Sequence, residues 1–230
     1  MRIVFNLIIA ILVTFSIIKV EQEFIKKPIF NLKSVEINKL SENLSSDIEP
    51  LKKSLINKNI YEIDIDFLEK MLNNDIRIES AKVEKVGLNN VVIDIKEREV
   101  SFYAQMQGKI YLLDDKGVIF GTLNERDRMN LPIFYIKKLE EIPGFIKIFQ
   151  KIDGAYLKDI VSQVYTDNKN SISLILNNGA VFKTDLSVNK EKYIVGEALY
   201  VDLSKTKKIE YIDLRFQDFV IKCLGEKNEK

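Results

Sequence analysis

Near its carboxyl end the chain reads Tyr211-Ile-Asp-Leu-Arg-Phe-Gln-Asp-Phe-Val-Ile-Lys222, a stretch in which apolar and polar residues alternate. In an extended chain, Ile212, Leu214 and Phe216 fall on one face, and Tyr211, Asp213 and Arg215 fall on the other. This pattern predicts a strand that buries one face, and the Asp and Arg on its second face suit the margin of a sheet. Because a marginal strand leaves backbone N–H and C=O groups unpaired, another chain can pair with it. We therefore expect a binding surface here.

The segment around this stretch, residues 99–224, predicts a β-rich domain of antiparallel strands with helices. Strands are expected over 101–106, 109–113, 118–120, 160–165, 171–176, 180–183, 209–216 and 219–223. A helix over 144–152 would cover the sheet, and Ser187 is expected to cap a second helix that bears Val188, Val195 and Leu199. Asn178-Gly179 is a strong hairpin signal. The pair Asp114-Asp115 precedes Gly117, so we interpret the two aspartates as part of a tight turn and not as a metal site or an acid/base dyad.

Residues 28–98 predict a smaller α+β domain. A strand within 32–40 precedes a helix that starts at Ser46, where Pro50 would fall in the first turn. A second helix follows a cap near Asp64 and carries Phe67, Leu68, Met71 and Leu72 on one face. Two strands, 78–86 and 91–98, then form a hairpin. The order strand, helix, helix, strand, strand predicts three strands with two helices on one face.

At the amino terminus, residues 3–20 are nearly all apolar and follow a short tail, residues 1–2. At about 1.5 Å per residue this run is slightly short for a membrane span, but no small-residue cleavage site follows it. We favour an uncleaved anchor over a signal peptide or a buried helix. Lysines after the run outnumber Arg2 before it, so charge alone does not settle the topology. Residues 225–230 are charged and predict a disordered tail.

Composition excludes several function classes. The chain has 230 residues and a net charge of +1, which gives no reason to expect nucleic-acid binding. It has no histidine, which removes Ser-His-Asp and Cys-His catalysis and imidazole metal sites. The single cysteine, Cys223, ends an apolar strand and is interpreted as a half-buried thiol. We expect no catalytic, metal or cofactor site and no small-molecule substrate.

Several local motifs resemble those of the FtsQ/DivIB family of bacterial division proteins. They are Asn59-Ile-Tyr61 with Ile63-Asp64, Ala81-Lys-Val-Glu-Lys85, Val91-Val-Ile-Asp-Ile-Lys-Glu97-Arg98, and above all Tyr211-Ile-Asp-Leu-Arg215. The order of elements over 28–98 also resembles a POTRA domain. The chain departs from the family pattern at Gly87-Leu88 and Glu99-Val100, where prolines are usual. Lys192 matches a lysine that the family often has, and we interpret it as a surface residue.

The resemblance implies a non-enzymatic scaffold in the cytoplasmic (inner) membrane at the division site. It implies one membrane pass, a cytoplasmic amino terminus and extracytoplasmic domains. Its partners would be FtsB- and FtsL-type proteins and other membrane division proteins, whose binding would help position septal cell-wall synthesis. Matching positions place partner contacts at six residues: Arg215, Phe216, Gln217, Asp218, Phe219 and Ile221. Phe216 and Phe219 would be apolar anchors, and Arg215 would pair with a carboxylate.

Other interpretations stay open. Both phenylalanines could be core residues and Arg215 a solvated charge. Glu97-Arg98 is by default a solvated strand end, because adjacent residues point to opposite faces. The whole chain could instead be a POTRA-bearing secretion or assembly chaperone, or a membrane-anchored cell-wall enzyme.

Overall fold

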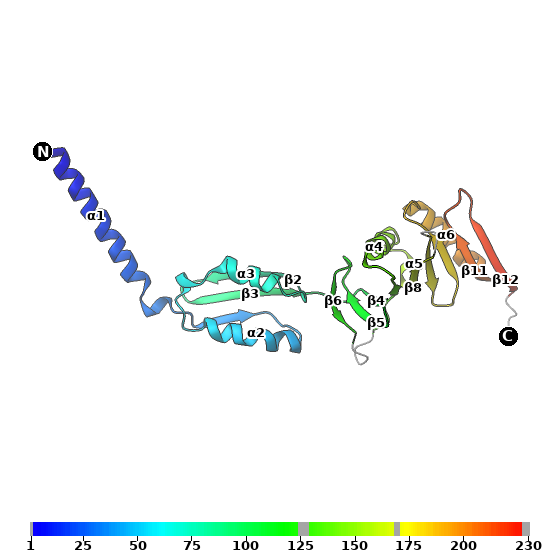
Figure 1. The fold of residues 1–230 in the computed structure, drawn as a ribbon, viewed down its shortest axis with the longest axis horizontal. Helices are drawn as coiled ribbons and strands as arrows, with labels where there is room; N and C mark the ends of the chain where they lie inside the picture. Colours follow the sequence, from blue (N-terminus) through cyan, green and yellow to red (C-terminus); the bar gives the residue numbers. More distant parts are fainter. Residues whose placement is uncertain (1, 124–128, 168–170, 227–230) are drawn as a thin grey trace. The chain divides into compact units, whose positions relative to one another are not determined.

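The computed structural model describes residues 2–123, 129–167 and 171–226, which form two compact units, Met1–Arg98 and Glu99–Lys230 (Figure 1). The predicted residues 227–230 of the tail lie outside the described part. Gly225 and Glu226 belong to the last strand, so the prediction of a disordered tail from residue 225 is wrong for these two residues.

The first unit begins with a long helix and continues as a small α+β domain. Its elements are α1 (Arg2–Ile25), η1 (Pro28–Phe30), β1 (Ser34–Ile37), α2 (Glu42–Leu55), η2 (Ile60–Glu62), α3 (Ile65–Asn73), β2 (Ile78–Val86) and β3 (Asn90–Glu97). The sheet order is β1-β3-β2, with β1 parallel and β2 antiparallel to β3. Alternate strand residues, such as Val91, Ile93 and Ile95, are buried in one cluster with Leu44 of α2 and Leu68 of α3. The two helices therefore cover one face, as predicted.

Helix α1 contains the predicted apolar run 3–20. Its described side chains from Leu7 to Val20 are exposed, and most of them are large and apolar. Within the described residues, no helix combines the length and the apolar character that crossing a membrane requires.

Two details of the predicted helices in this unit are wrong. Helix α2 begins at Glu42 and not at Ser46, so Pro50 lies in the helix interior. The earlier start is stabilised from a distant strand: the Glu97 carboxylate accepts hydrogen bonds from Ser41 N (2.5 Å) and Ser41 Oγ (2.6 Å). In α3, Leu68 and Leu72 are buried, but Phe67 and Met71 are exposed. Asp64 caps α3 as expected, since its Oδ1 accepts from Phe67 N at 3.0 Å.

Glu97 and Arg98 also differ from the default interpretation of a solvated strand end. Glu97 holds the start of α2, and Arg98 donates from Nε to the Ile76 carbonyl at 2.9 Å. Both residues therefore stabilise the unit itself.

The second unit is built on one nine-stranded sheet with the order β12-β11-β10-β9-β8-β7-β4-β5-β6. The strands are β4 (Phe102–Met106), β5 (Lys109–Leu113), β6 (Ile119–Thr122), β7 (Ile133–Tyr135), β8 (Val161–Thr166), β9 (Ile172–Leu176), β10 (Val181–Thr184), β11 (Lys207–Asp213) and β12 (Val220–Glu226). The helices are η4 (Leu139–Glu141), α4 (Ile142–Lys151), α5 (Tyr156–Ile160) and α6 (Lys190–Leu203). The sheet is mixed and not purely antiparallel, because β7 runs parallel to β4 and β8, and β10 runs parallel to β11.

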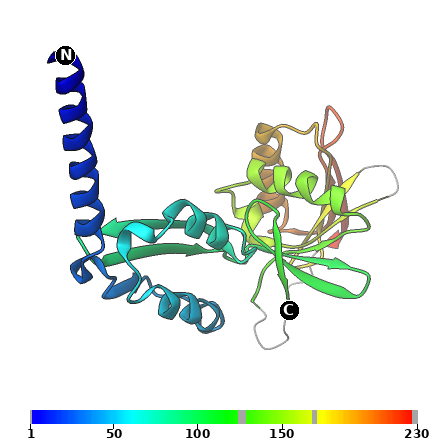
Figure 2. The same cartoon turned by 60° about the vertical axis from the view of Figure 1, so that its left-hand side comes forward.

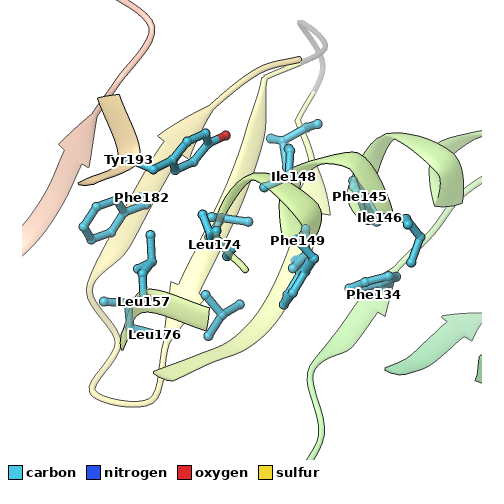
Figure 3. Packing of buried hydrophobic residues seen from close by; sticks show 14 of the residues in the cluster. Phe134, Phe145, Ile146, Ile148, Phe149, Leu157, Leu174, Leu176, Phe182 and Tyr193 are labelled. Carbon is cyan, nitrogen blue, oxygen red and sulfur yellow. The ribbon is translucent and has the colours of Figure 1, made fainter. Parts of the chain in front are cut away.

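One hydrophobic core fills the space between this sheet and its helices. Figure 3 shows Phe145 and Phe149 of α4 pointing toward strand residues that include Phe134 and Leu174, and Tyr193 of α6 lies in the same cluster. The predicted turn at Asp114 is confirmed: its Oδ1 accepts from Lys116 N (3.0 Å) and Val118 N (2.7 Å), and Gly117 has φ +82°. Helix α6 is capped by Asn189, whose side chain accepts from Lys192 N, and not by Ser187.

Candidate partner-binding site

Strand β12 forms one margin of the nine-stranded sheet, and β11 lies directly inside it. The two strands pair antiparallel, with Tyr211 opposite Lys222 and Asp213 opposite Val220. The strand predicted to be marginal, which begins at Tyr211, is therefore the second strand, β11, and that expectation is wrong. The margin itself is formed by β12. On its outer side, β12 faces no further strand of the described chain, so that edge can accept one.

Residues of β12 alternate between the core and solvent. Ile221 and Cys223 are partly buried and pack against the core, which confirms the half-buried thiol. Val220 and Leu224 are exposed on the opposite face, with Lys222 between them. A strand added beside β12 would find apolar side chains on both of its faces.

The segment that joins β11 to β12 leaves the sheet at Asp213. Leu214 is buried and donates from N to the Lys183 carbonyl of β10 at 2.9 Å. Arg215 then turns back toward Asp213: its backbone N (3.1 Å) and Nε (2.8 Å) donate to Oδ1, and Nη2 donates to Oδ2 at 2.6 Å. These bonds end the strand, so Phe216 does not continue the buried face of Ile212 and Leu214, and that expectation is wrong.

The Asp213–Arg215 pair is largely withdrawn from solvent. Asp213 is only 4% exposed. Burial raises the pKa of Asp213, but the hydrogen bonds and charge of Arg215 outweigh burial, so its pKa lies below the ordinary value. The expected pairing of Arg215 with a partner's carboxylate stays a prediction, and the structure gives this guanidinium an internal carboxylate.

The other predicted contact residues lie along the turn and the margin strand. Phe216 is 54% exposed, with the Arg215 guanidinium carbon 5.8 Å from its ring centre, and Gln217 and Asp218 are exposed beside it. Phe219 is partly buried and packs against the core together with Ile221. The structure thus brings all six predicted residues into one turn and one strand, with Phe216 the most prominent apolar side chain.

Helix α6 contacts this turn through Lys192 and Gly196. Lys192 Nζ donates to the carbonyls of Phe216 and Gln217, the latter at 3.2 Å, and lies 5.5 Å from the centre of the Phe219 ring. One turn further along α6, a Cβ on Gly196 would lie 2.8 Å from Leu214 Cδ2 and 3.5 Å from Phe219 Cε1. A side chain at this position would therefore require the buried Leu214 side chain to shift.

Sequence reasoning missed both Lys192 and Gly196 as parts of this site. Lys192 was interpreted only as a surface residue; its hydrogen bonds are indeed exposed, but its ammonium group also binds the turn. The available signal was the lysine shared with the family. A contact between residues 192 and 216, however, cannot be derived from sequence spacing.

Comparisons with known proteins agree with the two-unit organisation. The family model "Cell division protein FtsQ/DivIB, C-terminal" matches residues 102–215, and the model "POTRA domain, FtsQ-type" matches residues 30–98. The first match ends at Arg215, so the turn after it and β12 lie beyond the matched region.

Three curated relatives are similar over large parts of the chain. Cell division protein DivIB of Listeria monocytogenes is 26% identical over 145 residues, which cover 61% of this chain and 54% of that protein. DivIB of Clostridium tetani is 27% identical over 178 residues, covering 75% and 66%. FtsQ of Geobacter sp. is 23% identical over 208 residues, covering 84% and 76%. The chain spans about half to three quarters of the length of these relatives.

Proposed function

Because the chain belongs to the FtsQ/DivIB family of cell division proteins, we propose that it is a non-enzymatic scaffold that binds FtsB- and FtsL-type partners. In this role it would hold single-pass division proteins together and help position septal cell-wall synthesis. The observation that carries the proposal is the open margin at β12, with the turn 214–219 held beside it by hydrogen bonds from Lys192 and Arg215.

The binding mode that fits this surface is strand addition. A partner segment in extended conformation would pair its backbone with the outer edge of β12, and its alternate side chains would meet Val220 and Leu224 on one face. Main-chain hydrogen bonds supply affinity in this mode, and side-chain pockets supply specificity. The proposed contacts remain Arg215, Phe216, Gln217, Asp218, Phe219 and Ile221.

Phe216 is the proposed anchor of the complex. A large, half-exposed aromatic ring beside an open strand edge is the kind of residue that dominates interface energies. Lys192 binds the backbone carbonyl of Phe216, and the Arg215 guanidinium lies next to its ring, so we expect the residue to be largely placed before binding. A partner would therefore lose little free energy in ordering this side chain.

Helix α1 is proposed as the membrane anchor, with the two units on the extracytoplasmic side at the division site. The support is the apolar run 3–20 of the sequence, whose described side chains are exposed from Leu7 to Val20. Hydrocarbon would bury this surface.

The test is capture of purified FtsB- and FtsL-type proteins by the full chain in detergent. Phe216→Asp should weaken capture about 30-fold or more, since truncating a central aromatic anchor costs about 2 kcal/mol or more. Tyr156→Asp is the matched control, because Tyr156 is equally exposed at 54% but lies on α5 of the same unit. It should leave capture unchanged.

The proposal fails if the unmodified chain retains no such partner, or if both variants behave like it. Hydrolysis of purified peptidoglycan by the chain would instead support a cell-wall enzyme. Capture of unfolded outer-membrane or secreted polypeptides would support a chaperone.

A further inference from the structure

One end of the first unit gathers three turns around the carboxyl end of α1. Lys33 N donates to the Asn89 carbonyl at 2.8 Å, which joins the start of β1 to the β2–β3 turn. Leu32 N donates to the Lys58 carbonyl at 2.8 Å, which joins the same segment to the turn after α2. Figures 1 and 2 both show α1 ending beside this end of the sheet.

The end of α1 is fastened to these turns by aromatic packing and one hydrogen bond. Phe24, Phe30 and Tyr61 form a ladder of edge-on rings, with centres 5.4 Å and 5.2 Å apart. Asn59 Nδ2 donates to the Ile25 carbonyl at 2.7 Å. Whatever surface α1 enters, this end of the unit is held next to it.

Large apolar side chains are exposed at this end. Ile29 of η1, Tyr61 of η2 and Leu88 of the β2–β3 turn are each more than half exposed, at 52%, 55% and 51%. They come from three different segments that the hydrogen bonds and ring contacts above bring together. We call these three residues the apolar tips.

The segments that carry the apolar tips, and the segments hydrogen-bonded to them, also carry exposed lysines: Lys26, Lys27, Lys33, Lys58 and Lys85. Four glutamates, Glu23, Glu36, Glu62 and Glu84, lie in the same segments, so five lysines against four glutamates leave a net charge of +1. Lysine stems can lie along apolar surface while their ammonium groups reach phosphates. Apolar and aromatic tips on segments that also carry lysines fit the headgroup region of an anionic bilayer.

We infer that this end of the first unit is a membrane-contact surface, on which the apolar tips enter the interface of an anionic phospholipid bilayer and the lysines bind its headgroups. The inference rests on the proposed function in one respect, namely that α1 anchors the chain. It goes beyond an anchor, because it places a folded domain on the lipid surface.

The test uses the full chain with Cys223→Ser, reconstituted into phosphatidylcholine vesicles with or without phosphatidylglycerol. An environment-sensitive fluorophore is attached at Leu88→Cys. The matched control is the same fluorophore at Ile76→Cys, because Ile76 is 56% exposed and its carbonyl accepts from Arg98, at the opposite end of β2 and β3. The label at 88 should shift to the blue and lose access to an aqueous quencher in phosphatidylglycerol vesicles, and the label at 76 should not.

A charge-reversed variant separates lipid contact from a local effect of the label. Lys58→Glu with Lys85→Glu should abolish the shift at 88, and Lys70→Glu, on α3, should preserve it. Equal quenching at 88 and 76 in both kinds of vesicle overturns the inference while leaving the scaffold function standing. Extraction of the chain by alkaline wash overturns the anchor and this surface together. A shift at 88 without partner capture overturns the scaffold function alone.

Discussion

At the scale of residues, one local motif recurs in both units: it connects α3 to β2 in the first unit and lies at the end of β11 in the second. In Asp75-Ile-Arg77 and Asp213-Leu-Arg215, the aspartate Oδ1 accepts from the arginine backbone N and Nε, and Oδ2 accepts from Nη2. A carboxylate that receives two side-chain bonds from arginine is a strong, directional contact. In the second unit this contact turns the chain out of β11 and presents Phe216.

Removing the arginine of this pair should destabilise the second unit. Arg215→Ala leaves the carboxylate of Asp213 buried without its cation, and we expect a loss of about 3 kcal/mol in the free energy of unfolding. The double variant Asp213→Asn with Arg215→Leu should recover most of that loss, because no buried charge remains. Urea unfolding measures both, and equal stability of the single and double variants would contradict this account.

The same pair should make stability depend on pH in the acid range. Arg215 holds the folded-state pKa of Asp213 below its ordinary value, so the stabilisation is present above the unfolded pKa of about 3.9. It is lost as pH falls through the lower, folded pKa. In Asp213→Asn, the free energy of unfolding should depend less on pH in this range. A profile below pH 4 that is unchanged in Asp213→Asn would show that the acid sensitivity comes from other carboxylates.

At the scale of elements, α6 determines the shape of the turn between β11 and β12. Lys192→Met removes the ammonium group that binds the Phe216 and Gln217 carbonyls but keeps an unbranched side chain that is only one atom shorter. Amides of 216–219 should exchange hydrogen about tenfold faster, since a hydrogen bond from a charged group contributes about 1.5 kcal/mol. Lys190→Met, an exposed change at the start of α6, should leave these amides unaffected. Unchanged exchange in Lys192→Met would show that the turn is held by Asp213 and Gly196 alone.

Elements with local signals could be predicted from the sequence, and elements set by distant contacts could not. The hairpin of β2 and β3 and the turn at Asp114 have their determinants within a few residues, and both were predicted closely. The start of α2 depends on Glu97, some fifty residues away. The local cap signal at Ser46 therefore predicted a start that is too late. Strand β7 has three residues and exists because β4 and β8 lie on either side of it, which no local pattern indicates.

The same distinction applies to the candidate site. Its six residues lie within 215–221, next to the family motif that ends at Arg215, so the resemblance could indicate them. The structure places them together at the margin of the sheet. The internal partner of Arg215 was missed because alternation assigns residues 213 and 215 to a continuing strand. The contribution of α6 was missed because Gly196 and Lys192 act through contacts with a turn about twenty residues further along the chain.

At the scale of the whole molecule, each unit has its own hydrophobic core. Ile93 is completely buried in the first core, and Leu174 is completely buried in the second. Ile93→Ala should lower the stability of the first unit by about 3 kcal/mol and leave the second unchanged, and Leu174→Ala should do the reverse. Native-state hydrogen exchange reports both units in one sample. Equal loss of protection in both units from either variant would contradict separate cores.

The most direct test of the central claim is hydrogen exchange on β12 with and without a bound FtsB- or FtsL-type partner. Strand addition predicts that amides over 220–226 exchange more slowly in the complex, because the partner backbone pairs with the open edge. Amides of β6, at the other margin of the same sheet, should exchange at the same rate, and Phe216→Asp should remove the protection. A stable complex in which exchange over 220–226 is unchanged would contradict the account.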